Sequence, residues 1–385
     1  MSDLPTPDTA ALALSARLAD RIRAAIAAAG GRLGFDAYMQ LALYAPGLGY
    51  YVNGLRKFGA QGDFTTAPER SPLFARALAR QVAQVLAAVP DGEVLEFGPG
   101  SGALAAELLA ELDLLGCPPR RYLMLELSAE LQQRQRAAIA RRVPHLAGQV
   151  TWLEQLPEQF KGVVIANEVL DAMPARRFRV NDRGIAELFV TSGSDGLTLL
   201  AGPPQDERLT ARVAALDLPP GYESEVNFAA EAWVRTVCKG LQRGLLLLID
   251  YGYAQAEYYH PQRHTGTLQC HYRQRAHGDA LLWPGLQDIT AHVDFTAMAQ
   301  AGCEAGAVLA GFASQAQFLI NCGLPQLLEA IDPANPAYLD LALQARQLLL
   351  PQAMGEAFKV LALARGLDDG DRLIGFASGD RRHRL

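Results

Sequence analysis

The sequence predicts an α/β protein built on a doubly wound, mostly parallel sheet. Between residues 93 and 166, short apolar segments alternate with segments of helical period, which indicates βαβ units with helices on both faces of a sheet. Right-handed crossovers limit such units to a doubly wound layer. Apolar residues make up 50% of the 385 residues and charged residues 20%, so a large core is available and global disorder is excluded.

The expected elements follow in order along the chain. Residues 1–90 are expected to form helices around a glycine-rich loop at 54–68, and the last of these helices is expected at 72–88. Apolar runs and helical periods then predict a series of strands and helices. These are strands at 93–97, 122–126, 150–153 and 163–166, and helices at 102–115 and 129–142.

After Asp171 the pattern changes. Three short segments separated by turn residues predict an antiparallel β meander inserted at 176–201. An irregular insertion is expected at 251–287 and a helical one at 314–350. The remaining expected elements are helices at 228–239 and 293–301, strands at 244–250 and 305–310, and a last strand at 357–364, added antiparallel at the far end of the sheet.

This pattern suggests one sheet domain with additions. We expect an N-terminal helical extension with an active-site loop at 1–90, the sheet domain with its three insertions at 91–365, and a C-terminal tail at 366–385. The length of the chain, taken alone, would also fit two or three domains.

Composition and charge argue against several classes of function. The formal net charge of −6 argues against extended contact with nucleic acid. The longest strongly apolar run, Leu245–Ile249, is too short for membrane insertion. Five dispersed cysteines without a CxxC pair favour a reducing compartment, and we expect a cytoplasmic location, with a mitochondrial one as the weaker alternative. Cys270, His271 and His277 match no common zinc spacing, so no metal is expected.

The strongest local signal is a glycine turn, Glu96-Phe97-Gly98-Pro99-Gly100-Ser101-Gly102, placed between a strand and a helix. Glycines let the backbone turn sharply and approach a ligand, and the helix N-terminus that follows offers free N–H groups. The turn lacks the lysine of a P-loop and has G-x-G-x-G instead of the G-x-G-x-x-G of NAD sites. Glu96 suits a ligand with a cationic amino group, so we expect Glu96, Gly98, Gly100 and Gly102 to bind such a cofactor.

A second acid, Glu126, ends the next strand, 24 residues after Gly102. A carboxylate at this strand tip can accept hydrogen bonds from both ribose hydroxyls of an adenosine ligand. The alternative is an acid that merely precedes the helix at 129–142, with Ser128 as the helix cap. Together with the glycine turn, the two acids favour S-adenosylmethionine over NAD as the cofactor.

Polar residues also follow the fourth strand, in the segment Asn167-Glu168-Val169-Leu170-Asp171. Ligands of open α/β sheets lie beyond the carboxyl ends of the strands, so we expect Asn167 to contact the cofactor. Glu168 and Asp171 are three residues apart, and one helical turn could aim both carboxylates at a guanidinium group. The alternative is that Asp171 caps a helix and that Glu168 is solvated.

Two further segments are candidates for the active site. The loop that contains Gly62, Asp63 and Thr65 is rich in glycine and small hydroxyls and could fold over a cofactor, although a surface turn would have the same composition. His292 is expected near the start of a helix, where it could orient an acceptor or take a proton. The alternative is a packed His292 beside an N-cap at Asp288 or Thr290.

Four blocks in this order resemble the MidA family of S-adenosylmethionine-dependent methyltransferases. The blocks are GAQGDFTTAPE at 59–69, EFGPGSG at 96–102, NEVLDAMP at 167–174 and DITAHVDF at 288–295. The resemblance implies a class I methyltransferase sheet of Rossmann-like type, with cofactor contacts at Gly98, Gly100 and Glu126. It also implies that the Gly62–Thr66 loop forms a wall of the active site. A mitochondrial member of the family dimethylates an arginine of a complex I subunit.

We therefore expect a methyltransferase that acts on an arginine of a complex I-type protein subunit and assists assembly of that complex. In the expected mechanism, Glu168 and Asp171 hold the guanidinium and polarise one nitrogen, and His292 or water removes the proton. The open alternatives are methylation of another side chain or of a small molecule, and a non-catalytic assembly chaperone that binds the cofactor. Nucleic acid and membrane insertion are not expected, and a homodimer is possible.

Overall fold

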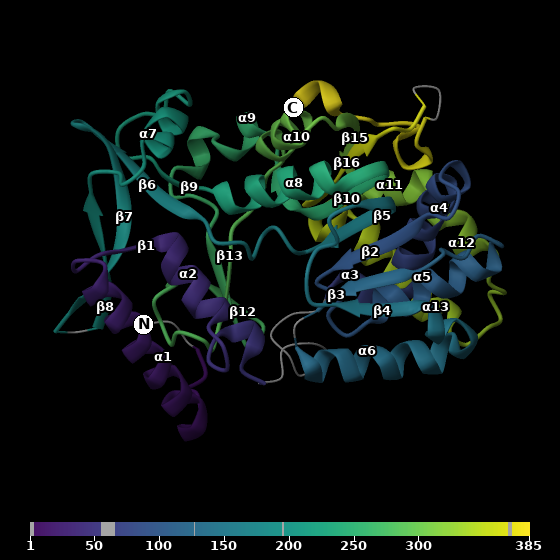
Figure 1. Ribbon diagram of the computed structural model, residues 1–385, viewed down its shortest axis with the longest axis horizontal. Helices are drawn as coiled ribbons and strands as arrows, with labels where there is room; N and C mark the ends of the chain where they lie inside the picture. Colours follow the sequence, from purple (N-terminus) through teal and green to yellow (C-terminus); the bar gives the residue numbers. More distant parts are fainter. Residues whose placement is uncertain (1–3, 55–65, 127, 195, 369–371) are drawn as a thin grey trace. The chain divides into compact units, whose positions relative to one another are not determined.

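The computed structural model describes residues 4–54, 66–126, 128–194, 196–368 and 372–385 (Figure 1). The chain forms two compact units, each assembled from segments far apart in the sequence. Unit 1 comprises Met1–Phe64, Asp171–Ala230 and Gln255–His292, and unit 2 comprises Thr65–Leu170, Glu231–Ala254 and Val293–Leu385. The division expected from the sequence cuts the chain into consecutive segments at residues 90 and 365. The two units of the structure instead each combine segments from both sides of residue 90.

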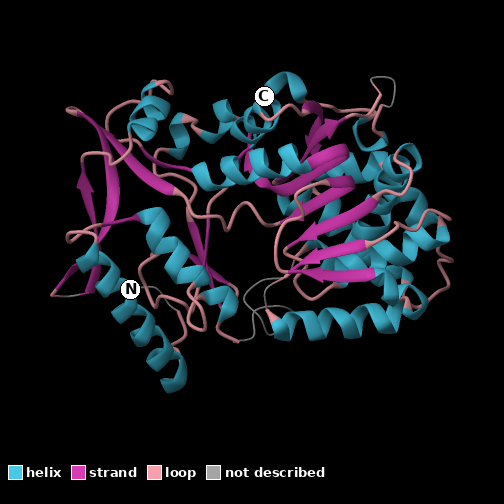
Figure 2. Ribbon diagram, viewed as in Figure 1, coloured by secondary structure: helices cyan, strands magenta, loops and turns pink. Residues whose placement is uncertain are grey.

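Unit 2 is built on an eight-stranded sheet (Figure 2). From one edge to the other its strands are β15 (Val308–Ser314), β16 (Phe358–Arg365), β10 (Leu241–Tyr253), β5 (Phe160–Asn167), β2 (Glu93–Phe97), β3 (Tyr122–Leu125) and β4 (Val150–Leu153). The short β14 (Val293–Asp294) pairs with the end of β10. The strands from β10 to β4 are parallel, which confirms the predicted α/β fold and mostly parallel sheet.

The last strand differs from the prediction in its position. β16 is antiparallel to its neighbours, as expected, but it lies between β10 and β15 instead of at the far end of the sheet. Its central residues Val360–Leu363 have no exposed surface, so side chains on both faces of the strand are buried. A strand that is apolar on both faces suits the interior of a sheet rather than its edge.

Helices cover both faces of this sheet, as alternate strand residues show. Val163 and Ile165 of β5 belong to the core that includes α4 (Pro72–Ala88) and α5 (Ala103–Leu114). On the opposite face, the ring of Phe97 packs edge-on against Trp233 of α8 (Phe228–Gly240), with centroids 4.7 Å apart. The other helical segments of unit 2 are α3 (Ala67–Arg70), α6 (Ala129–Arg142), η2 (Pro144–Gln149), α10 (Phe295–Glu304), α11 (Gln315–Asn321), α12 (Leu324–Glu329), α13 (Tyr338–Leu349), η4 (Pro351–Gly355), η5 (Ile374–Phe376) and η6 (Arg382–Arg384).

Local signals explain where several of these helices begin. Ser128 caps α6, since its hydroxyl accepts a hydrogen bond from the Leu131 N–H at 3.4 Å. Asp294 caps α10 by accepting from the N–H groups of Thr296 and Ala297. The helix expected at 293–301 therefore begins later, at Phe295, and Val293–Asp294 forms β14 instead. Across the described ranges, no helix has the length and apolar character needed to span a bilayer.

Unit 1 contains the inserted strands. Its larger sheet runs β1 (Leu33–Gly34), β7 (Gly184–Gly193), β6 (Arg176–Asn181) and β9 (Glu223–Val226), with β8 (Gly196–Gly202) paired to β7. β6, β7 and β8 form the antiparallel meander expected at 176–201. The segment expected to be irregular contains α9 (Gln255–Tyr258), η3 (Pro261–Arg263), β11 (Gln269–Tyr272) and β12 (Arg275–His277), and β11 also pairs with β13 (Asp288–Thr290). The helices α1 (Thr9–Ala28), α2 (Phe35–Tyr44), η1 (Tyr50–Val52) and α7 (Glu207–Ala214) complete the unit.

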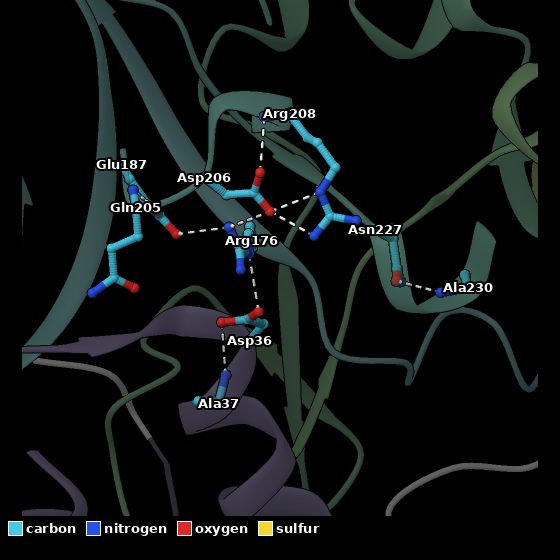
Figure 3. Close-up of polar contacts among 9 residues, drawn as sticks. All are labelled: Asp36, Ala37, Arg176, Glu187, Gln205, Asp206, Arg208, Asn227 and Ala230. Carbon is cyan, nitrogen blue, oxygen red and sulfur yellow. Dashed lines mark hydrogen bonds and ion pairs between the residues drawn. The ribbon is translucent and has the colours of Figure 1, made fainter. Parts of the chain in front are cut away.

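A charged network centred on Arg176 joins separate segments of unit 1 (Figure 3). The Arg176 guanidinium bonds Asp36 at 3.1 Å and lies 3.6 Å from Asp206 and 3.9 Å from Glu187. Glu187 is 1% exposed, and its second carboxylate oxygen accepts from the Gln205 N–H at 2.9 Å. Burial raises the pKa of Glu187, and the nearby Arg176 opposes that rise. The network thus links the start of α2, the strands β6 and β7, and the segment that leads into α7.

Candidate functional site

The glycine turn of unit 2 lies between β2 and α5, at the carboxyl end of β2. Gly98, Gly100 and Gly102 have φ values of 59°, 51° and 82°, in the left-handed region that favours glycine. A Cβ at Gly102 would lie 2.9 Å from the Cα of Gln135, so any other residue would force the turn and the helix apart. The turn therefore packs tightly against Gln135 of α6 and ends directly before the N-terminus of α5.

Glu96 lies one residue before the end of β2 and is 2% exposed. Its Oε2 accepts a hydrogen bond from the Tyr122 hydroxyl at 2.6 Å. Burial raises the pKa of Glu96 to about 7, and the hydrogen bond from Tyr122 acts in the opposite direction. A cationic group bound near this carboxylate would favour its ionised form. The expected contact between Glu96 and the amino group of a cofactor stays a prediction.

Glu126 directly follows β3, beside the glycine turn. Phe97 pairs with Leu125, so the two segments leave neighbouring strands at the same edge of the sheet. The Glu126 carboxylate accepts from the Ser128 N–H at 2.8 Å and from the Gln135 side chain at 3.3 Å. Ser128 is the cap of α6, as in the alternative interpretation. Glu126 nevertheless lies at the tip of the strand, where the bonds from Ser128 and Gln135 hold its carboxylate.

Asn167 ends β5, the strand on the other side of β2. Phe97 pairs with Ala166, so Asn167 lies at the level of the glycine turn. Its Nδ2 donates to Glu168 Oε1 at 3.1 Å. Its Oδ1 is buried and has no hydrogen-bond partner among the described residues. A buried acceptor of this kind fits a hydrogen-bond donor from a bound ligand.

Glu168 is held in an unusual backbone conformation. Its φ is 54°, although it is not a glycine. The Glu168 N–H donates to Ile249 O at 2.9 Å, and its carboxylate accepts from the Ala67 N–H at 3.2 Å. Glu168 is half-buried and hydrogen-bonded, so the alternative of a simply solvated carboxylate does not describe it.

Asp250 holds the rest of this turn, a role that sequence reasoning missed. It is 1% exposed and lies in β10, next to the last residue that pairs with β5. Its Oδ2 accepts from the N–H groups of Val169 and Leu170, at 3.2 and 3.0 Å. The available signal was the acid in Asp250-Tyr251-Gly252 after an apolar run.

Asp171 belongs to unit 1, whereas Glu168 belongs to unit 2. Asp171 is 6% exposed, and its carbonyl oxygen accepts from the Ala291 N–H at 2.9 Å. Residues 171–175 form turns and irregular backbone without a helix, so Asp171 does not cap a helix as the alternative supposed.

The structure places Asp171 near Tyr44, Tyr51 and Asp288, of which the sequence had singled out only Asp288, as a helix cap. The Tyr51 hydroxyl donates to Asp288 Oδ1 at 2.8 Å, and Tyr44 stacks on Tyr51 with centroids 5.4 Å apart. Burial, Asp288 and Asp171 together raise the pKa values of both tyrosines. Asp288 is 4% exposed, so this cluster contains two buried acids and two stacked phenols, which we call the Asp171–Asp288 cluster.

His292 is half-buried at the end of unit 1. Its backbone N–H donates to the Thr267 hydroxyl at 3.1 Å, and Thr267 in turn bonds the buried Glu225. Asp288–Thr290 forms β13, so neither Asp288 nor Thr290 is the helix cap that the alternative proposed beside His292. His292 lies near the start of a helix, as expected, but outside it, because α10 begins three residues later. Gly62, Asp63 and Thr65 lie outside the described residues.

A family model described as "Putative S-adenosyl-L-methionine-dependent methyltransferase" matches residues 77–313. The chain belongs to this family. The resemblance to the MidA methyltransferases is thereby confirmed, and S-adenosylmethionine is the cofactor of this methyltransferase.

Individual relatives cover most of this methyltransferase. The protein arginine methyltransferase NDUFAF7 of Mus musculus mitochondria is 30% identical over an alignment of 366 positions, which covers 85% of this chain and 79% of that protein. Its homolog in Drosophila melanogaster is 28% identical over an alignment of 383 positions, which covers 91% of this chain and 85% of that protein. A crystal structure from Burkholderia thailandensis, bound to S-adenosylhomocysteine, covers 100% of both chains with 49% identity and a TM-score of 0.96.

The residues at the edge of the unit 2 sheet fit this cofactor. The glycine turn has a left-handed backbone directly before a helix N-terminus, and Asn167 presents a buried acceptor without a partner in the described chain. Glu126 lies where a carboxylate can accept hydrogen bonds from ribose hydroxyls. We therefore assign Gly98, Gly100, Gly102, Glu126 and Asn167 to cofactor binding as predictions that binding measurements can test.

Proposed function

We propose that this methyltransferase modifies an arginine side chain of a protein, with a subunit of a respiratory complex I-type assembly as the acceptor. Two facts support the proposal. Relatives at 30% and 28% identity are named protein arginine methyltransferases. The observation that carries it is the Asp171–Asp288 cluster, in which two buried carboxylates lie beside two stacked tyrosines.

The cluster has the chemistry that a guanidinium group requires. A guanidinium is planar and cationic, with a pKa above about 12, and carboxylates bind it through charge-assisted hydrogen bonds. Tyrosine faces add cation–π attraction. Burial and the two acids raise the pKa values of Tyr44 and Tyr51. Both hydroxyls donate within unit 1, Tyr44 to Ala172 O at 3.0 Å and Tyr51 to Asp288 Oδ1 at 2.8 Å, and so hold the two rings in place.

Methyl transfer places modest demands on the protein. S-adenosylmethionine supplies an activated methyl group when bound. The residues of the chain must align the acceptor nitrogen in line with the bond that breaks, and they must accept the proton that this nitrogen loses. Glu168, Asp171 and His292 remain the proposed groups for these tasks. The same proposal includes a cytoplasmic location, in which the enzyme binds the acceptor subunit before that subunit is assembled into the complex.

The test uses the full-length enzyme with methyl-labelled S-adenosylmethionine and purified complex I-type subunits. We expect label on protein arginine, identified as methylarginine by mass spectrometry. Asp171→Asn and Asp288→Asn should each lower turnover at least tenfold, since each removes one charge-assisted partner of the guanidinium. Asp340→Asn, at an exposed position of α13, should retain normal turnover.

Other outcomes would contradict the proposal. Label on lysine, on a carboxylate or on a small molecule would replace arginine as the acceptor. In cells that lack this protein and fail to assemble the complex, a variant without transferase activity could restore assembly. That result would point to a non-catalytic chaperone. Normal turnover of both aspartate variants would remove the Asp171–Asp288 cluster from the acceptor site.

A further inference from the structure

Gln135 of α6 joins three segments at the edge of the unit 2 sheet. It has no exposed surface. Its Nε2 donates to Gly100 O at 2.9 Å and to Glu126 Oε2 at 3.3 Å. Its Oε1 accepts from the Trp152 indole N–H at 2.7 Å. One buried amide therefore bonds the glycine turn, the residue after β3, and β4.

The bonding pattern requires an amide at this position. The NH₂ group provides two donors, one for each acceptor, while the carbonyl oxygen accepts the indole N–H. A glutamate would lose both donors and place a second negative charge beside Glu126. A leucine would leave the Trp152 indole N–H and the Gly100 carbonyl without these partners.

The same residue also fixes the backbone of the turn. The Gly102 backbone lies so close to Gln135 that a Cβ on Gly102 would be 2.9 Å from the Gln135 Cα. The indole that Gln135 accepts from is itself covered by Arg136, whose guanidinium carbon lies 3.7 Å from the ring centroid. Gln135 is thus held from one side by Trp152 while it bonds the turn and Glu126 on the other.

Both oxygens of Glu126 are oriented by these contacts. Oε1 accepts from the Ser128 N–H at 2.8 Å and Oε2 accepts from Gln135. Two adjacent hydroxyls, as on a ribose, match such a pre-oriented carboxylate.

We propose that Gln135 is a positioning residue for the cofactor, which sets the Glu126 carboxylate and the glycine turn in one fixed geometry. The inference rests on the assignment of Glu126 to the cofactor ribose. Its specific consequence is that Gln135 acts on ligand affinity through Glu126. Removing either residue should then weaken the same contact to the ribose.

The test is a double-mutant cycle on ligand affinity, measured by calorimetry with S-adenosylhomocysteine and its 2′-deoxy analogue. We expect Glu126→Gln and Gln135→Leu each to weaken S-adenosylhomocysteine about tenfold or more. The double variant should be no weaker than the weaker single variant, because both changes remove one contact. Each single variant should also discriminate less between the two ligands than the unaltered enzyme does.

Two further variants keep the test independent of folding. Gln135→Glu has nearly the same shape and retains the indole bond, so it should fold and lose affinity at least as strongly as Gln135→Leu. Gln133→Leu, at an exposed position of the same helix, should leave affinity and discrimination unchanged. Thermal unfolding without ligand measures any general loss of stability.

The outcomes separate the possible failures. Additive losses, with discrimination against the 2′-deoxy analogue intact in Gln135→Leu and Gln135→Glu, would show a merely structural role and overturn the inference. Unchanged discrimination in Glu126→Gln would overturn it too, by removing Glu126 from the ribose. Neither result depends on the identity of the methyl acceptor, so the arginine proposal would be unaffected.

Discussion

At the scale of single residues, Glu96 shows how burial changes the chemistry of a motif. The carboxylate is 2% exposed beside the glycine turn, and burial raises its pKa from 4.5 to about 7. The folded protein therefore retains a proton on Glu96 that the unfolded chain releases between these two pH values. As the pH rises through this window, Glu96 lowers the free energy of unfolding, and the full loss is present above about pH 7.

Replacing Glu96 by glutamine should remove this pH dependence. Glu96→Gln should match the unaltered protein in stability below about pH 4.5 and exceed it at pH 8, by at most about 3 kcal/mol. Urea unfolding at both pH values measures the difference. Glu329→Gln, at an exposed position of α12, is the matched control and should show no such gain. A Glu96→Gln protein that is equally stable at pH 8 would show that Glu96 titrates normally.

At the scale of elements, the turn after β5 depends on a neighbouring strand. Glu168 has a positive φ without being a glycine, and such a conformation costs on the order of 1 kcal/mol or more. Asp250 compensates from β10 by accepting the N–H groups of Val169 and Leu170. The chemistry of the turn thus depends on a residue about 80 positions away in the chain.

Removing the acceptor should release this turn. Asp250→Ala leaves two N–H groups without their acceptor, so we expect a loss of roughly 2–4 kcal/mol in the free energy of unfolding. Methyl transfer should fall with it, because Glu168 would no longer be held. Asp250→Asn retains one carbonyl oxygen as an acceptor and should lose less. Equal losses in both variants would instead indicate that the charge of Asp250 matters, for example toward Lys359, its register partner on β16.

At the scale of the whole molecule, sequence reasoning succeeded where the signals are local. The α4 and α6 helices lie at the predicted bounds, and in the structure Ser71 and Ser128 cap them. The apolar runs likewise predicted β2 and β4 at their observed bounds. The position of β16 was missed because it depends on the pairing of β16 with β10, whose partner residues lie more than 100 positions earlier in the chain.

The same reason explains the gaps in the predicted sites. Gln135 occupies an ordinary helical position, and only the fold brings it to Gly100 and Glu126. Tyr51 and Asp288 are likewise 237 residues apart in the chain yet share a hydrogen bond. Composition and spacing identify the glycine turn, since φ constraints are local, but they do not reveal which distant side chains support it.

Cofactor binding should raise the free energy of unfolding of the whole protein, because the glycine turn joins β2, an interior strand of the sheet, to the helix α5. A ligand that binds only the folded chain adds about 2.7 kcal/mol to the free energy of unfolding at 100 times its Kd. We expect S-adenosylhomocysteine to have this effect, measured by urea unfolding with and without ligand. Gly98→Ala should reduce it by at least about 1.4 kcal/mol, a tenfold loss of affinity, since φ is 59° and the added Cβ would lie 3.1 Å from Val169.

The control for this prediction shares the backbone strain but not the site. Gly116 follows α5 with a φ of 68°, and a Cβ there would meet nothing within 4 Å. Gly116→Ala should therefore lower the stability of the free protein, as Gly98→Ala does, while it retains the full gain from ligand. If both variants kept that gain, the turn would tolerate a side chain and its backbone would not approach the cofactor. If both lost it, general destabilisation rather than the turn would limit binding.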